Sequence, residues 1–177
     1  MESLIGTGKV RYIGISNFDL YQLSTIQIHS TIKPLVHQFE AHPYLQQWEF
    51  MHYHQLLGIT VTAYSPLGNL NPGYDQSFPS ILEDDVISEI ATKRGCTNVQ
   101  VALSWGMGRG TSVIPKAEDP AHVLENVKSV ECYLHEDDYD AIEAIEGKYV
   151  KRFNKPGKGW GVQLYQGLDD PDDCRYD

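Results

Sequence analysis

Four short apolar runs in this chain each end on polar residues, and a segment with helical character follows each run. The runs cover residues 10–17, 35–40, 59–65 and 111–116. Such alternation is typical of a parallel sheet covered by helices. In these folds the binding residues collect at the carboxyl ends of the strands. Here those ends read Ser-Asn, Gln-Phe-Glu, Tyr-Ser-Pro and Pro-Lys, which predicts a ligand site at one edge of the sheet.

The segments between the runs carry the spacing and capping signals of helices. Asn17 is expected to cap the first helix and Asp119, followed by a proline, a later one. Gly58 is a suitable left-handed end for the second. The helices are predicted over residues 20–29, 45–57, 84–94, 98–107, 120–130 and 136–146, after a possible helix end at residues 4–8.

Two stretches lack periodicity. The connection over residues 68–79 is rich in Gly, Asn, Pro and Asp, and a loop of that length is more often functional than accidental. The tail from residue 147 is expected to be irregular and frayed at residues 169–177. The sequence therefore predicts one domain over residues 1–146, followed by a C-terminal tail over residues 147–177.

Composition excludes several classes of partner. The net charge of −10 argues against nucleic acid and against an anionic membrane surface. No apolar stretch approaches the roughly 20 residues of a membrane span, and the N-terminus lacks the pattern of a signal peptide. Cys96, Cys132 and Cys174 are odd in number and widely spaced, which favours a reducing cytoplasm over a disulfide framework or metal site. His52 and His54 do not share a helix face, so no metal site is predicted there either.

Four sequence blocks stand in the order and spacing of a known family. They are Gly-Ile-Ser-Asn-Phe at 14–18, Gln38 with His-Pro-Tyr at 42–44, Tyr-Ser-Pro-Leu-Gly at 64–68 and Val-Ile-Pro-Lys at 113–116. Together they resemble the aldo-keto reductase family over about residues 1–145. The resemblance implies a (β/α)₈ TIM barrel that interconverts carbonyls and alcohols with NADP(H), or with NAD(H). A whole barrel needs roughly 250 residues, so the chain resembles a truncated barrel, the C-terminal four βα units.

The resemblance places the family's catalytic Asp, Tyr, Lys and His before the start of this chain. Tyr44 and His42 offer no convincing substitute, because nothing near them in sequence lowers the phenol pKa from about 10. No catalytic residue is therefore assigned. Two hypotheses stay open: a reductase that takes these residues from elsewhere, and a non-catalytic dinucleotide-binding or regulatory module.

On the nicotinamide side, the resemblance assigns Ser16, Asn17 and Gln38 to the ring carboxamide, which both donates and accepts hydrogen bonds. Tyr64 would stack on the ring face. The alternatives are that Ser16 and Asn17 only cap a helix, that Gln38 is a satisfied buried amide and that Tyr64 belongs to the core or rim.

On the phosphate side, the resemblance assigns the segment from Ser65 to Gly68 to the pyrophosphate, with residues 69–75 as a belt over the dinucleotide. Asp75 in that belt needs a cationic partner. Lys116 would meet the adenosine 2′-phosphate. Ala117 and His122 replace the Ser and Arg of many members, which predicts a weak preference for NADPH over NADH. The residues assigned on this side are Ser65, Pro66, Leu67, Gly68, Ile114, Lys116, His122, Glu125 and Asn126.

A half-barrel would leave strand edges and an inner face exposed. We therefore expect self-association or a partner that supplies the missing half. The substrate class implied by the resemblance is a small carbonyl compound or alcohol. Trp160 in the tail falls where the family selects its substrate, although simple packing of the tail explains it equally well.

Overall fold

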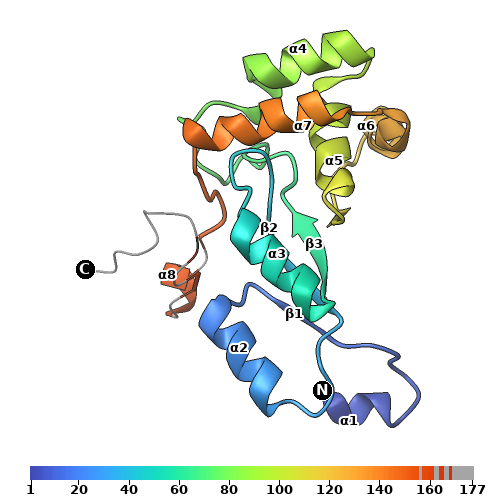
Figure 1. Cartoon of the computed structure of the whole chain (residues 1–177), viewed down its shortest axis with the longest axis vertical. Coiled ribbons are helices and arrows are strands. Elements are labelled where there is room, and N and C mark those ends of the chain that lie inside the picture. The colour runs from blue at the N-terminus through green and yellow to red at the C-terminus, as the bar shows by residue number, and fades with distance from the viewer. Residues whose placement is uncertain (156, 162–163, 166–167, 169–177) are drawn as a thin grey trace. The chain divides into compact units, whose positions relative to one another are not determined.

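A computed structural model describes residues 1–155, 157–161, 164, 165 and 168 (Figure 1). The strands are β1 (Gly14–Ser16), β2 (Val36–Glu40), β3 (Thr60–Tyr64) and β4 (Ser112–Val113). The helices are α1 (Glu2–Ile5), α2 (Leu20–His29), α3 (Trp48–Leu57), α4 (Asp85–Arg94), α5 (Asn98–Gly108), α6 (Pro120–Val127), α7 (Glu136–Glu143) and α8 (Gly157–Trp160). Short 3₁₀ turns are η1 (Ile81–Glu83), η2 (Lys128–Glu131) and η3 (Ala144–Gly147).

The four strands form one sheet in the order β1-β2-β3-β4, so chain order and spatial order agree. β1 and β2 are parallel, with Ser16 opposite Gln38. The Ile114 N–H, just after β4, donates to the Ala63 carbonyl of β3 at 3.1 Å. The predicted α/β fold with a parallel sheet is confirmed at this level, although β1 and β4 are shorter than the sequence runs.

Helix ends follow the local signals in most places. α2 has the predicted bounds, Gly58 ends α3 at a φ of 66°, and the Asp119 side chain caps α6. The prediction that Asn17 caps α2 is wrong. Asp19 is the cap, because its side chain accepts the Gln22 N–H while the Gln22 side chain accepts the Asp19 N–H.

Other boundaries differ for identifiable reasons. α3 begins at Trp48 rather than at residue 45, because His42 and Leu45 bond to each other in a turn and Gln47 has a left-handed φ of 50°. The last two long helices tighten into η2 and η3 before their predicted ends. The described residues of the tail are irregular from Lys148 onward apart from α8, and the fraying expected at residues 169–177 lies outside the described residues.

The chain divides into two compact units. The first comprises Met1–Phe39, Gln47–Thr62 and the described residues from Lys155 onward. The second comprises Glu40–Gln46 and Ala63–Asn154, and its core includes the fully buried Trp105 and Ile87. The predicted carboxamide contacts Ser16, Asn17 and Gln38 lie in the first unit, and the other predicted cofactor contacts, Tyr64 included, lie in the second.

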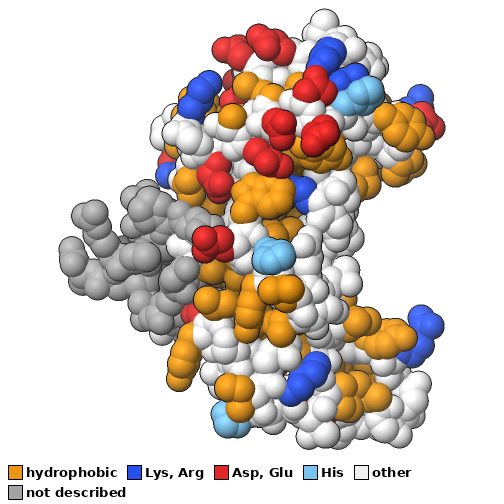
Figure 2. Space-filling model, viewed as in Figure 1, with side chains coloured by type: hydrophobic (Ala, Val, Ile, Leu, Met, Phe, Trp, Pro, Cys, Tyr) orange, Lys and Arg blue, Asp and Glu red, His pale blue; other side chains and the backbone are white. Residues whose placement is uncertain are grey.

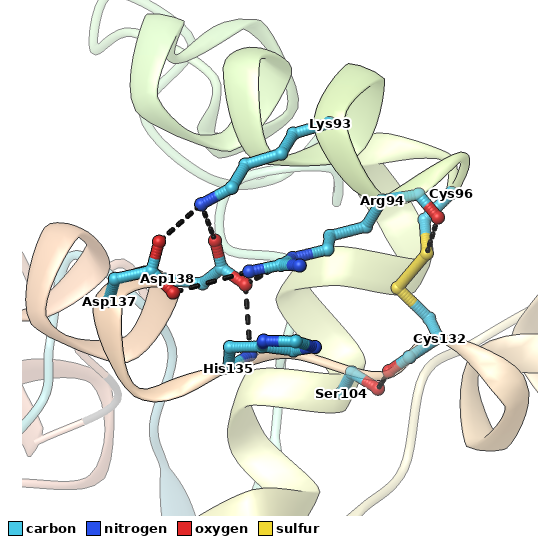
Figure 3. A network of polar contacts seen from close by, with 8 residues as sticks. All are labelled: Lys93, Arg94, Cys96, Ser104, Cys132, His135, Asp137 and Asp138. Atoms are coloured by element: carbon cyan, nitrogen blue, oxygen red, sulfur yellow. Dashed lines mark hydrogen bonds and ion pairs between the residues drawn. A yellow bond between two sulfur atoms is a disulfide. The ribbon is translucent and has the colours of Figure 1, made fainter.

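A disulfide joins Cys96 to Cys132 in the second unit, so the expectation that the cysteines form no disulfide is wrong (Figure 3). The two residues are 36 positions apart, and their pairing depends on how α5 brings the end of α4 close to the end of η2. Sequence spacing alone does not reveal such a contact. With this disulfide, the cysteines no longer give a reason to expect a cytoplasmic location.

Ion pairs support the same region. Lys93 and Arg94 at the end of α4 both reach Asp137 and Asp138 at the start of α7, with Arg94 Nε 2.6 Å from an Asp138 oxygen (Figure 3). The Asp138 side chain is buried, which raises its pKa, but the bonds from Arg94, the His135 N–H and Lys93 more than offset this, so its pKa lies well below the ordinary value. The disulfide and this ion-pair cluster together tie α4 to the chain around α6 and α7.

One face of the second unit is acidic. Figure 2 shows Asp and Glu side chains gathered over α4 and α7, where exposed residues include Asp85, Glu89, Glu136 and Asp140. Among the described residues, the helices are too short and too polar to cross a lipid bilayer.

Candidate functional site

A pocket of about 230 Å³ in the second unit holds six of the predicted cofactor residues together. It forms because the Ile114–Ala63 hydrogen bond brings the segments after β3 and β4 side by side. Both segments follow the carboxyl ends of their strands, where sheet ligands bind. The pocket is lined by Ser65, Pro66, Leu67, Gly68, Leu70, Asn71, Pro72, Ile114, Pro115 and Lys116.

The backbone after β3 turns sharply at the pocket. Ser65 has a left-handed φ of 46°, and the Gly68 N–H donates to the Ser65 carbonyl at 2.9 Å. Gly68 has a φ of 70°, and a Cβ there would lie 2.5 Å from Cδ1 of the buried Ile81. Only glycine fits this position without displacing the core. The turn therefore keeps the backbone close beneath the pocket.

The loop after this turn is held by its own contacts. Asn69 donates to the Phe78 carbonyl at 2.9 Å, and the Tyr74 and Ser65 hydroxyls are 3.0 Å apart. Asp75 finds the cationic partner that the sequence left unnamed, because its carboxylate lies 3.3 Å from Lys151 Nζ. Bonds from Ser77 and the nearby Lys151 lower the pKa of Asp75. The loop thus has a defined conformation on one side of the pocket.

Lys116 brings a cation to the pocket. Its Nζ lies 2.7 Å from a Glu118 oxygen, and that hydrogen bond lowers the pKa of Glu118. The side chains of Lys116 and Glu118 are 85% and 81% exposed, so water screens the pair and it contributes little. Lys116 therefore remains accessible to an anionic ligand, with a carboxylate beside it.

The resemblance assigns Glu125 and Asn126 to the adenine, and both lie on α6 together with His122, which replaces the arginine of the 2′-phosphate site. His122 is exposed, whereas Glu125 and Asn126 are half-buried. None of the three is among the described residues that line the pocket. Among the described residues, these three therefore share one helix but lie outside the lining of the pocket that includes Lys116.

Tyr64 ends β3 and is half-buried, although it is not among the described pocket-lining residues. Its hydroxyl accepts a hydrogen bond from Asn154 at 3.1 Å. Asn154 is held in turn by its backbone N–H, which donates to Glu40 at 2.8 Å. The sequence does not reveal this use of Asn154, because Asn154 is distant in the chain from both Glu40 and Tyr64. The one signal for this contact in the sequence is Glu40, a carboxylate at the end of an apolar strand.

Glu40 is fully buried and heavily bonded. It contacts His42 at 3.0 Å and accepts the Phe153 N–H at 2.7 Å. Burial raises the pKa of Glu40, but the bond to His42, the charge of Arg152 and the Phe153 N–H outweigh burial, and the net pKa is lowered. Glu40 thus anchors the chain at 152–154 as a carboxylate.

In the first unit, the three predicted carboxamide contacts lie together. Ser16 is paired with Gln38 across β1 and β2, and the Asn17 N–H donates to the Gln38 carbonyl at 3.0 Å. Asn17 Oδ1 is buried and has no hydrogen-bond partner among the described residues. A buried acceptor without a donor is costly, and the amide N–H of a carboxamide would satisfy it. These residues therefore fit a nicotinamide group.

Comparison with known proteins decides the family. Residues 1–147 match the model of the Aldo/keto reductase family. The chain belongs to this family. Among curated relatives of this aldo-keto reductase chain, an uncharacterized oxidoreductase of Schizosaccharomyces pombe is 45% identical over 172 residues, which are 96% of this chain and 52% of the relative.

Two further comparisons bear on chemistry and fold. The NADPH-dependent D-xylose reductase of Meyerozyma guilliermondii is 38% identical over 161 residues, 88% of this chain and 50% of that protein. The solved structure of aldose reductase from Giardia lamblia matches with a TM-score of 0.81 at 36% identity, covering 92% of this chain and 53% of that one. The chain therefore spans about half the length of these aldo-keto reductases.

Proposed function

We propose that this chain binds NADP(H), with NAD(H) as the alternative cofactor, for an aldo-keto reductase that interconverts small carbonyl compounds and alcohols. The observation that carries the proposal is the pocket where the turn from Ser65 to Gly68 meets Lys116. The names of two relatives support the proposal. One is the NADPH-dependent D-xylose reductase described above. The other is an NADP-dependent D-sorbitol-6-phosphate dehydrogenase of Malus domestica, which is 37% identical over 167 residues, 93% of this chain and 53% of that protein.

The residues divide the binding task by chemistry. A pyrophosphate suits the backbone turn and hydroxyl at Ser65, and an adenosine 2′-phosphate suits the charge of Lys116. A nicotinamide carboxamide suits Ser16, Asn17 and Gln38, because the buried Asn17 Oδ1 has no hydrogen-bond donor among the described residues. When bound, the cofactor supplies the hydride, and the protein supplies binding and orientation.

Cofactor preference follows from the groups around Lys116. Ala117 offers no hydroxyl, and His122 is an exposed imidazole where an arginine would give a fixed charge. Glu118 adds a carboxylate 2.7 Å from Lys116 Nζ, which repels a phosphate. These features support only a weak preference for NADPH over NADH.

In this proposal the chain corresponds to the second half of a barrel. The family resemblance places the catalytic acid and base outside the 177 residues. We propose that they come from another segment or polypeptide. The second candidate function is a dinucleotide-binding or regulatory module without hydride transfer.

An exposed apolar stripe supports association with such a half-barrel or with a second copy. Val123, Val127 and Val130 recur at helical spacing along α6 and η2, and they are 46%, 63% and 64% exposed. Figure 2 shows apolar side chains on the surface over α6. Light scattering after size exclusion should therefore find a dimer or larger species, and a stable monomer that does not bind ANS would count against association.

Calorimetric titration of the purified chain with NADPH tests the binding proposal. The wild-type chain should bind one equivalent, and Gly68→Ala should bind much more weakly, because its Cβ clashes with Ile81 and shifts the turn. Gly95→Ala is the matched control, since Gly95 has a similar φ of 67° but open space around its Cβ. Absence of binding to the wild-type chain would refute the proposal.

An absorbance assay with NADPH and a reactive aldehyde separates the two candidates. If the catalytic groups come from elsewhere, the chain alone gives no turnover, and adding the missing half restores it. Binding without turnover in either mixture would favour the non-catalytic module.

A further inference from the structure

Two fully buried histidines in the first unit lie in direct contact. His37 on β2 and His54 on α3 have no exposed surface, and His37 Nδ1 is 2.7 Å from His54 Nε2. Neither belongs to the predicted carboxamide contacts, yet His37 directly precedes Gln38 in the chain. Two imidazoles this close need a hydrogen between them and cannot both present one.

The neighbouring backbone groups decide where the hydrogens are. The Phe18 N–H donates to His37 Nε2 at 3.1 Å, so that nitrogen is an acceptor and His37 carries its hydrogen on Nδ1. His37 therefore donates to His54 Nε2. His54 in turn carries its hydrogen on Nδ1 and donates to the Phe50 carbonyl at 2.6 Å. The Phe18 N–H, the two imidazoles and the Phe50 carbonyl all have hydrogen-bond partners only when both rings are neutral and carry their hydrogens on Nδ1.

The surroundings favour the neutral rings. The ring centroids of Phe39 and Phe50 lie 4.9 and 5.8 Å from that of His37, and Phe50 lies 4.4 Å from His54. Burial among these rings, and the proximity of His54, lower the pKa of His37 to about 3. Burial also lowers the pKa of His54 despite its bond to Phe50. The pair thus acts as a fixed hydrogen-bonded unit rather than as a charge.

This unit holds the backbone beside the predicted carboxamide contacts. Asn17 has a left-handed φ of 58°, which a residue other than glycine keeps only when its surroundings impose it. Three successive N–H groups are bonded there: Asn17 to the Gln38 carbonyl, Phe18 to His37 and Asp19 to Gln22. The middle bond connects the turn, through both imidazoles, to helix α3.

We infer that His37 and His54 are positioning residues of the nicotinamide seat, which keep the Asn17–Phe18 turn in the orientation that presents Ser16 and Asn17 to the carboxamide. The inference rests on the proposed function and extends it to two residues that need not touch the cofactor. His54 fixes the tautomer of His37, and His37 fixes the Phe18 N–H.

Substitution of His54 separates this role from simple packing. In His54→Phe the ring volume remains, but His37 loses its acceptor. It must then leave Nδ1–H unpaired or move the hydrogen to Nε2 and release Phe18. His54→Gln keeps a side-chain acceptor for His37. Met51→Ala is the control, because Met51 is also buried but is an apolar residue of the same helix.

The probes are NADP⁺ and adenosine 2′,5′-bisphosphate, which lacks the nicotinamide. His54→Phe should weaken NADP⁺ binding about tenfold and leave the bisphosphate unchanged. His54→Gln should restore most of the NADP⁺ affinity, and Met51→Ala should alter neither ligand. Equal losses for both ligands, or no loss for NADP⁺, would overturn the positioning role alone. If the wild-type chain bound neither ligand, the proposed function would fall, and this inference with it.

The tautomers give a readout that packing alone would not move. Nitrogen-15 NMR at pH 7 should show His37 protonated on Nδ1 and not on Nε2, and His54→Phe should speed hydrogen exchange at the Phe18 amide. A charged ring, the opposite tautomer or unchanged exchange at Phe18 would also overturn the inference.

Discussion

The turn at Asn17 in the first unit and the pocket beside Lys116 in the second are organised by different forces. The turn is fixed by buried, neutral hydrogen bonds that run through His37 and His54. The pocket presents an exposed cation next to an exposed anion, over a glycine turn. The first arrangement depends on packing and tautomer, and the second on charge and salt.

This contrast matches the chemistry of the proposed ligand. A carboxamide is recognised by the direction of its donors and acceptors, so the groups around it must be held precisely in place. A phosphate is recognised mainly by charge, which acts over a longer range and tolerates a mobile lysine. Perturbations of packing, pH and charge should therefore affect the two regions differently.

The largest effect is expected from the disulfide in the second unit. Replacing Cys96 and Cys132 by serine opens a loop of 36 residues, which in the chain-entropy account costs about 3–4 kcal/mol of unfolding free energy. Urea unfolding of the double variant measures the loss, with Cys174→Ser as the control. A loss below about 1 kcal/mol would show that the helices and ion pairs hold this region without the disulfide.

Acid should affect the first unit through His37. Its pKa is about 3 in the folded chain against 6.5 in the unfolded chain, so the unfolded state binds the proton first and stability falls as pH falls below 6.5. Between pH 6.5 and pH 5, before most carboxylates titrate, this one group should cost about 1.5 kcal/mol. The stability of a His37→Gln, His54→Gln double variant should change less over that interval, and an equal change in both proteins would contradict this assignment.

Removing the positive charge of Lys116 should change cofactor affinity at the pocket. Lys116→Met should weaken NADPH binding about tenfold, reduce its salt dependence and leave NADH binding almost unchanged, because only NADPH carries the 2′-phosphate. Lys128→Met, an exposed lysine in η2, is the control. Equal losses for both cofactors would place the role of Lys116 elsewhere.

The smallest effect is expected at Glu118. Removing its charge in Glu118→Gln should tighten NADPH binding about threefold, since Lys116 loses a competing carboxylate. Glu131→Gln, at an exposed position in η2, should change nothing. If Glu118→Gln weakened NADPH binding, the carboxylate would be orienting Lys116 rather than opposing the phosphate.

Local signals predicted much of the fold. The strand positions, the bounds of α2 and the ends at Gly58 and Asp119 depend on neighbours within a few residues, and the sequence contains those neighbours. The sequence also placed Lys116 and the turn from Ser65 to Gly68 at adjacent strand ends, which the structure joins in one pocket.

The missed features depend on residues that meet only after folding. The Asp75–Lys151 and Cys96–Cys132 contacts bring distant segments together, and no local pattern announces them. The sequence shows His54 only as an unsuitable metal ligand, since its partner His37 lies 17 residues away on a strand and no local pattern links the two. The prediction that Asn17 caps α2 is wrong because Asp19, two residues later, fits the same role and forms reciprocal hydrogen bonds with Gln22.

Backbone amide chemical shifts of the chain, recorded while NADP⁺ is added, test the central claim most directly. We expect saturable shifts at the turn from Ser65 to Gly68 and at Lys116 in the second unit, and at Asn17 and Phe18 in the first. Shifts confined to other residues, or no shifts at millimolar NADP⁺, would contradict it.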